Sequence, residues 1–117
     1  MQAATDENGT AVVTTDGDID GGNAHLLLAT LLPLAREHDH VVVDMRKTRT
    51  MTSKGLAALL DSCRLLDERG RLTIINASDD VATLLELTGL SRLAEVRPGG
   101  RQRHSRPRTG SEAGRER

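Results

Sequence analysis

Ser53 is the side chain of this 117-residue sequence whose position best suits chemistry. It follows a polar loop after the apolar segment 41–43 and stands at the start of a stretch with helical apolar spacing. A hydroxyl at that point lies beside backbone N–H groups that lack intrahelical partners, at the positive end of the helix dipole. It can serve as an N-cap, worth about 1 kcal/mol. If it is phosphorylated, the same N–H groups can receive the added charge.

Other polar residues offer weaker candidates for a chemical site. Asp18 and Asp20 could ligate a metal or act as paired carboxylates, but two Asp in a Gly-rich loop are common in turns, and a calcium loop needs more ligands. A serine hydrolase would need a histidine base for Ser53. No G-x-S-x-G motif surrounds Ser53, and sequence alone ties no carboxylate to a chosen histidine. The four histidines are scattered at His25, His38, His40 and His104.

The composition restricts the class of protein. No run of about 18 apolar residues occurs, so we expect no membrane span, and the acidic start lacks the features of a signal peptide, which favours the cytoplasm. The single cysteine, Cys63, excludes an internal disulfide and is expected to be a buried, inert thiol. The chain has no aromatic residue, which argues against base stacking and hence against direct nucleic-acid binding.

The net charge of −1 conceals an uneven distribution. Residues 97–117 contain seven Arg and two Glu, whereas residues 1–96 carry a net charge of −6. The sequence after Pro98 is rich in Gly, Arg, Ser and Pro and poor in apolar side chains, which predicts disorder. We therefore expect three parts: a flexible N-terminus or short first strand over residues 1–10, a folded domain over 11–96 and a disordered Arg-rich tail over 97–117.

The elements that must position Ser53 alternate along the folded part. β-branched runs predict strands at 11–15, 40–45, 71–76 and 94–96, and apolar residues at helical spacing predict helices at 24–37 and 54–69. A third helix is expected to begin after Ser78 as N-cap and to end at Gly89. Pro33 should kink or restart the first helix. The second helix places one apolar set on a single face, namely Leu56, Leu59, Leu60, Cys63 and Leu66.

Strands that alternate with helices predict an α/β fold, because helical crossovers join parallel neighbours. Residues 41–43 are apolar at consecutive positions, which suits a strand covered on both faces. The expected architecture is a small, mostly parallel mixed sheet covered by helices.

Four segments of the chain resemble the STAS domain of bacterial anti-sigma factor antagonists. Residues 17–20 (GDID) resemble the family's G-E/D-L-D after its second strand, and residues 41–45 (VVVDM) resemble its V-V-L-D-L strand. Residues 51–56 (MTSKGL) resemble an apolar residue followed by D-S-S/T-G-L, and residues 86–90 (ELTGL) resemble its final T-G-L motif. The segments occur in the family's order and together cover about residues 11–96.

The resemblance implies a regulatory function. Such proteins bind an anti-sigma factor, often a serine kinase, and thereby release a sigma factor. The kinase phosphorylates the serine of the third motif, which corresponds to Ser53, and a phosphatase resets the cycle. Two residues depart from that motif: Thr52 replaces the aspartate before the serine, and Lys54 replaces the small hydroxyl residue after it. The preceding loop, residues 46–50, is also unusually basic.

We therefore predict a cytoplasmic, non-enzymatic, monomeric binding module that uses no cofactor, metal ion or catalytic residue. Ser53 is the expected phosphorylation site. The expected partner-binding residues are Asp20, Asn23, Thr52, Ser53, Lys54 and Gly55. Two alternatives remain: a degenerate STAS scaffold that binds its partner without phosphorylation, and a small α/β serine hydrolase.

Overall fold

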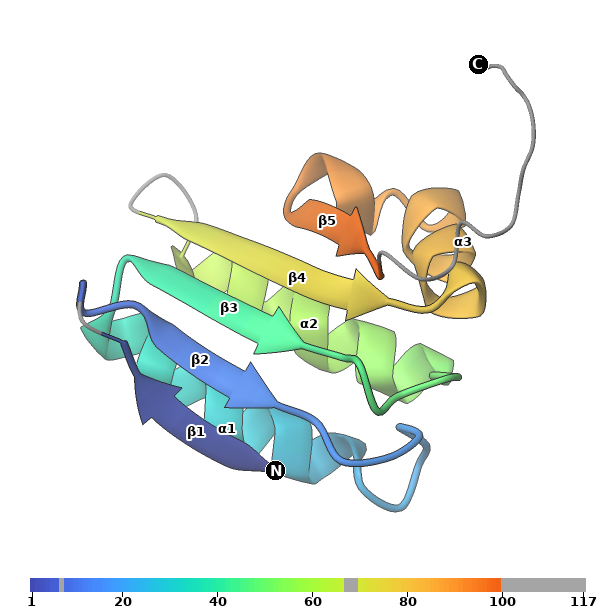
Figure 1. Ribbon diagram of the computed structural model, residues 1–117, viewed down its shortest axis with the longest axis horizontal. Coiled ribbons are helices and arrows are strands. Elements are labelled where there is room, and N and C mark those ends of the chain that lie inside the picture. Colours follow the sequence, from blue (N-terminus) through green and yellow to red (C-terminus); the bar gives the residue numbers. More distant parts are fainter. Residues whose placement is uncertain (7, 67–69, 100–117) are drawn as a thin grey trace.

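The computed structural model describes residues 1–6, 8–66 and 70–99. The predicted tail, apart from residues 97–99, lies outside this range. Five strands and three α-helices occur in the described residues (Figure 1). Their order is β1 (Gln2–Thr5), β2 (Ala11–Thr14), α1 (Ala24–Glu37), β3 (His40–Asp44), α2 (Ser53–Leu66), β4 (Arg71–Ala77), α3 (Asp79–Leu87), the 3₁₀ turn η2 (Leu90–Arg92) and β5 (Glu95–Pro98).

The strands form one sheet in the order β1-β2-β3-β4-β5. β1 runs antiparallel to β2, and the other neighbouring pairs are parallel. The predicted α/β class with a mostly parallel mixed sheet is confirmed. β1 lies within residues 1–10, where the sequence left a flexible segment or a short strand open.

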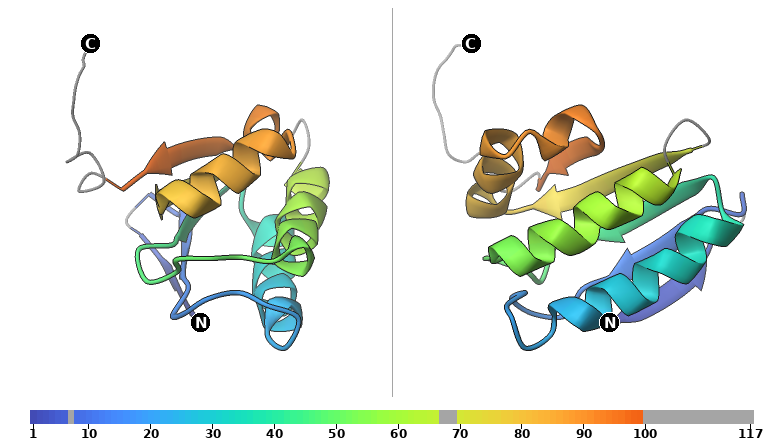
Figure 2. Two further views of the ribbon diagram at one scale, coloured as in Figure 1. Left: turned by 90° about the vertical axis from the view of Figure 1, so that its right-hand side faces the viewer. Right: turned by 180° about the vertical axis from the view of Figure 1, so that it is seen from behind.

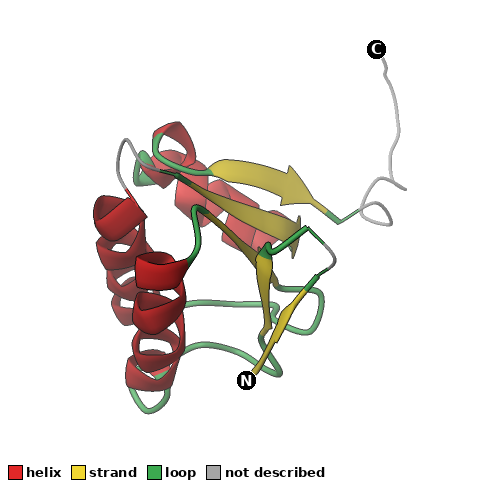
Figure 3. Ribbon diagram, turned by 90° about the vertical axis from the view of Figure 1, so that its left-hand side faces the viewer, coloured by secondary structure: helices red, strands yellow, loops and turns green. Residues whose placement is uncertain are grey.

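The helices lie on one side of the sheet, with α1 and α2 side by side across it and α3 beside β5 (Figures 2 and 3). Right-handed crossovers that always step to the next strand in the same direction place successive helices on the same face. The prediction that β3 is covered on both faces is therefore wrong. Val41 and Val43 are buried beneath the helices, whereas Val42 is only half-buried on the uncovered face.

Local signals explain where the helices begin and end. Ser78 is the N-cap of α3, and its Oγ accepts a hydrogen bond of 3.1 Å from Val81 N. Gly89 adopts a φ of +82° after α3, a conformation that glycine reaches without a steric penalty, and Leu90 packs into the core behind it. Pro33 lies inside α1, which is a single helix. Its ring is exposed, so water can solvate the carbonyl that proline leaves unpaired.

Candidate functional site

Ser53 is exposed at the first residue of α2, on the loop that leaves the carboxyl end of β3. The Thr52 carbonyl accepts the first intrahelical hydrogen bond, from Leu56 N at 3.2 Å. Thr52 therefore occupies the N-cap position, and the expectation that Ser53 is the N-cap is wrong by one residue. Ser53 instead presents its hydroxyl from the first turn, where the backbone N–H groups remain available to an anion.

The loop before Ser53 is paired with the loop that follows β2. Ile19 N donates to Thr50 O at 3.1 Å, and Thr52 N donates to Ile19 O at 2.9 Å. Asp18 supports this pairing, because its Oδ1 accepts from Arg49 N at 3.0 Å and from Thr50 N at 3.2 Å. The N–H groups of Arg49 and Thr50 hold the pKa of Asp18 below its usual range. Asp18 is thus a positioning residue, a role that the sequence did not assign to it.

Two buried threonines, Thr15 and Thr48, also join these loops through side-chain hydrogen bonds. Thr48 Oγ1 donates to Gly17 O at 2.6 Å and lies 2.5 Å from Thr15 Oγ1, which is placed to donate to it. Thr15 Oγ1 also lies 3.4 Å from Asp44 O, which is a second acceptor for this hydroxyl. Thr15 and Thr48 are 0% and 1% exposed, so their hydroxyls depend on partners within the protein.

Asp44 is the last residue of β3, and its carboxylate binds Arg46 of the basic loop at residues 46–50. Its Oδ2 accepts from Arg46 Nη2 at 2.6 Å, and its Oδ1 accepts from Asn76 Nδ2 at 3.0 Å. Burial acts to raise the pKa of Asp44, but the hydrogen bonds from Arg46 and Asn76 prevail and hold it below its usual range. Ser78 Oγ donates to Arg49 O at 2.8 Å, which ties the start of α3 to the Ser53 loop.

Of the other predicted partner residues, some are exposed to solvent and others hold the local structure in place. Asp20 and Lys54 are exposed, and the stem of Lys54 approaches Gly21. The Asn23 side chain is engaged within its own loop, because Oδ1 accepts from Asp20 N and Nδ2 donates to the Asp18 carbonyl. Gly55 is buried, and a Cβ there would lie 2.5 Å from Met51 Cγ. Gly55 therefore contributes to packing rather than to a contact surface.

An apolar groove of about 320 Å³ begins at Ser53 and runs between α2 and the α3–η2 segment. The apolar set predicted for α2 is divided: Leu59, Cys63 and Leu66 are buried, whereas Leu56 and Leu60 are half-buried in this groove. The groove is lined by Ser53, Leu56, Ala57, Leu60, Thr88, Gly89, Leu90 and Leu93. The sequence does not predict this surface, although the segment that resembles the family's T-G-L motif, residues 88–90, supplies part of it.

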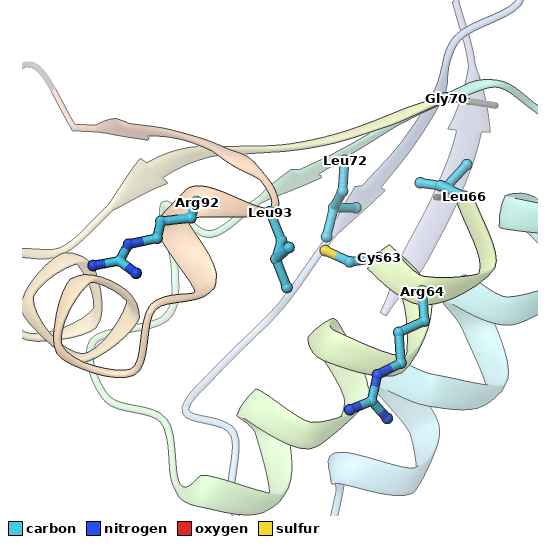
Figure 4. A pocket seen from close by; sticks show the side chains of 7 residues that line it. All are labelled: Cys63, Arg64, Leu66, Gly70, Leu72, Arg92 and Leu93. Carbon is cyan, nitrogen blue, oxygen red and sulfur yellow. The ribbon is translucent and has the colours of Figure 1, made fainter. Parts of the chain in front are cut away.

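Leu93 also borders a second hollow of about 220 Å³ farther along α2 (Figure 4). Cys63 lies in this hollow near Leu72, and the side chains of Arg64 and Arg92 lie on opposite sides of it. Burial raises the pKa of the Cys63 thiol to about 11. This finding agrees with the expected inert thiol, since the thiolate is the reactive form.

The described residues offer little support for catalysis or metal binding. His38 Nδ1 pairs with Gly9 O at 2.9 Å, and His40 Nε2 lies 3.0 Å from Thr73 Oγ1, so both side chains are engaged away from Ser53. His25 is exposed on α1. No cluster of three or more potential metal ligands occurs in the described part of the chain.

A model of the STAS domain matches residues 2–100, and the chain belongs to that family. An anti-sigma factor antagonist from Mycobacterium paratuberculosis has a similar structure, with 22% identity and a TM-score of 0.73 over 83% of this chain and 85% of that chain. The anti-sigma factor antagonist SpoIIAA, in its unphosphorylated form, is 19% identical, with a TM-score of 0.69 over 81% of this chain and 85% of that chain. An anti-sigma factor antagonist domain protein from Planctomyces limnophilus is 12% identical, with a TM-score of 0.71 over 87% of this chain and 92% of that chain.

No functionally curated protein matches the chain. Within the residues described by the structure, no helix has the length and apolar character needed to cross a membrane.

Proposed function

We propose that this protein is a cytoplasmic anti-sigma factor antagonist that binds an anti-sigma factor through the Ser53 end of α2 and the adjoining apolar groove. Binding sequesters the anti-sigma factor and releases its sigma factor. The observation that carries the proposal is the exposed Ser53 hydroxyl at the mouth of an apolar groove, within a fold shared with anti-sigma factor antagonists.

The groove supplies the adhesive part of the surface. Leu56 and Leu60 are half-buried in it, and Leu93 is 57% exposed. A partner that covers these side chains gains about 25 cal/mol for each Å² of apolar surface removed from water. Asp20, Thr52 and Lys54 provide a polar rim around Ser53, which fits the usual anatomy of an apolar interface core within a polar border.

Phosphorylation of Ser53 by a serine-kinase anti-sigma factor provides the switch. A phosphoserine adds a charge of about −1.5 to −2 at pH 7. The positive end of α2 tolerates this charge within the protein, whereas an apolar partner surface at the groove mouth would have to accept it without water. The partner is therefore released while the domain stays folded, and a phosphatase restores the binding form.

The first test is phosphorylation itself. We expect the full chain, incubated with ATP and each purified anti-sigma kinase of its host, to gain one phosphate that peptide mass spectrometry assigns to Ser53. Ser53→Ala should remove the modification. If the wild-type chain binds a kinase stably but no phosphate appears, the constitutive scaffold is correct, and Thr52 and Lys54 have removed the kinase site.

The second test separates charge at the site from charge elsewhere. Ser53→Asp should weaken binding to the anti-sigma factor at least tenfold in isothermal titration calorimetry, with circular dichroism unchanged. Thr83→Asp is the matched control, because Thr83 is exposed on α3 and does not line the groove. Equal affinities of the two variants would contradict the switch. Purified chain without measurable hydrolysis of ester substrates, with Ser53 present or absent, would count against the hydrolase alternative.

A further inference from the structure

The apolar groove adjoins the hollow that Arg64 and Arg92 line (Figure 4), because the Leu93 side chain borders both. Ser53 and Arg64 are eleven residues apart on one helix, which corresponds to about 16 Å, or three helical turns. The combined surface is therefore an elongated track along α2. Its end at Ser53 is the proposed switch, and its far end carries two cations.

Within the described residues, these two cations are poorly neutralised. The Arg92 side chain has no ion-pair or hydrogen-bond partner in the described part of the chain. Arg64 lies 3.6 Å from Asp61, with exposures of 70% and 49%, and exposed pairs of this kind contribute little. Arg46 and Arg97 differ in this respect, since Arg46 is bound by buried Asp44 and Arg97 contacts Glu95 at 2.7 Å.

We infer that the track receives an amphipathic helix of the anti-sigma factor, with a carboxylate at the end of the track that carries Arg64 and Arg92. Apolar side chains at i, i+4 and i+7 of such a helix would cover Leu56, Leu60 and Leu93, as in other complexes that seat a helix in a groove. An Asp or Glu one turn farther along would then lie near Arg64 or Arg92, whose guanidinium groups match carboxylate geometry well. This inference rests on the proposed function and specifies the partner's chemistry.

The arrangement separates two electrostatic effects on the same partner. Phosphate at Ser53 opposes binding at one end, while the arginines attract the helix at the other. Charge complementarity of this kind mainly selects the partner and accelerates its association. The cationic end should therefore act whether or not Ser53 is modified.

The test is a titration of the full chain against each purified anti-sigma factor of its host. For a factor that binds the wild type, the double variant Arg64→Glu/Arg92→Glu should bind at least tenfold more weakly at 50 mM salt, and the difference should shrink at 500 mM. Arg36→Glu is the control, because Arg36 is exposed in the last turn of α1 and lies outside both hollows. Thermal unfolding of each variant checks that the fold is retained.

A second pair of variants tests the apolar part of the track. Leu93→Asp should weaken binding at least tenfold, whereas Leu87→Asp should not, although Leu87 is 79% exposed and Leu93 only 57%. Lysine in place of the partner's acidic residue should restore affinity for the double variant.

The possible failures are distinguishable. If no anti-sigma factor binds the wild type, the proposed function and this inference both fall. If a factor binds the wild type and the Arg64→Glu/Arg92→Glu variant within twofold of each other at 50 mM salt, only the helix-and-carboxylate inference is overturned.

Discussion

Replacing Gly55 with alanine tests the packing that holds the site together. A Cβ at this position would lie 2.5 Å from Met51 Cγ and 2.7 Å from Ile19 Cγ2. Both distances are shorter than ordinary contact, so the start of α2 must move away from the paired loops. Overpacking of this kind costs about 1–3 kcal/mol, and the better helix propensity of alanine offsets about 0.5–1 kcal/mol of that.

The middle of these two ranges gives an expected net loss of about 1 kcal/mol in the free energy of unfolding. For a domain of this size each kcal/mol lowers Tm by about 4–8 °C, which differential scanning calorimetry resolves easily. Gly21→Ala is the control. A Cβ at position 21 would meet only the flexible end of Lys54, at 3.7 Å, and its effect should stay within about 0.5 kcal/mol.

A double-mutant cycle identifies the clash itself. Met51→Ala removes the atom nearest to the new methyl group, so Met51→Ala combined with Gly55→Ala should cost less than the sum of the single changes. A Gly55→Ala protein as stable as the wild type, or strictly additive effects in the cycle, would refute the assignment of Gly55 to close packing.

Three further predictions concern the loops and the thiol. The pKa of folded Asp18 lies below its unfolded value of about 3.9. Its contribution to stability is therefore present above pH 4 and is lost as the pH falls through the folded pKa. Asp18→Asn should flatten the pH dependence of urea unfolding between pH 5 and 3. Thr48→Val leaves the buried Thr15 hydroxyl without its nearest partner, and chemical denaturation should show a loss of about 1–3 kcal/mol in the free energy of unfolding. Adding Thr15→Val to the same chain should partly restore that stability, and full additivity of the two changes would contradict the hydroxyl pair. Cys63, with its raised pKa and burial, should react with Ellman's reagent at pH 8 only after unfolding, and rapid reaction of the native protein would contradict its placement.

The sequence predicted the elements of the fold because their signals are local. Ser78 and Gly89 mark the two ends of α3 through a side-chain oxygen and a left-handed backbone conformation, and both signals can be recognised from a few neighbouring residues. The continuous α1 was less predictable. Whether Pro33 breaks a helix depends on whether its ring faces solvent, and the overall packing of the domain determines that orientation.

The errors share a different physical cause. Three consecutive valines read as a strand buried on both faces, but the side that helices cover depends on the direction in which the crossovers step along the sheet. Similarly, one apolar stripe on α2 gave no indication that Leu56 and Leu60 line a groove while Leu59 is buried in the core. That division depends on the position of η2, about 30 residues later in the chain.

Of the candidate site, the sequence indicated Ser53 and its polar neighbours, but not the surface beside them. The sequence suggested a metal ligand, a paired carboxylate or a turn residue at Asp18, because its use as an acceptor for Arg49 and Thr50 requires two loops more than 30 residues apart to meet. The groove needed Leu93 as well, and an isolated leucine after a turn carries no recognisable pattern. The features of the site that the sequence does not predict therefore depend mostly on contacts between residues far apart in the chain.

The pairing of Ile19 with Met51 and Thr52 has a consequence for the speed of recognition. Because both loops are already fixed to each other in the free protein, a partner need not order them during docking, and the entropy of ordering is lost in folding instead. Association should then resemble the meeting of two rigid bodies, with a single kinetic phase whose rate rises linearly with partner concentration.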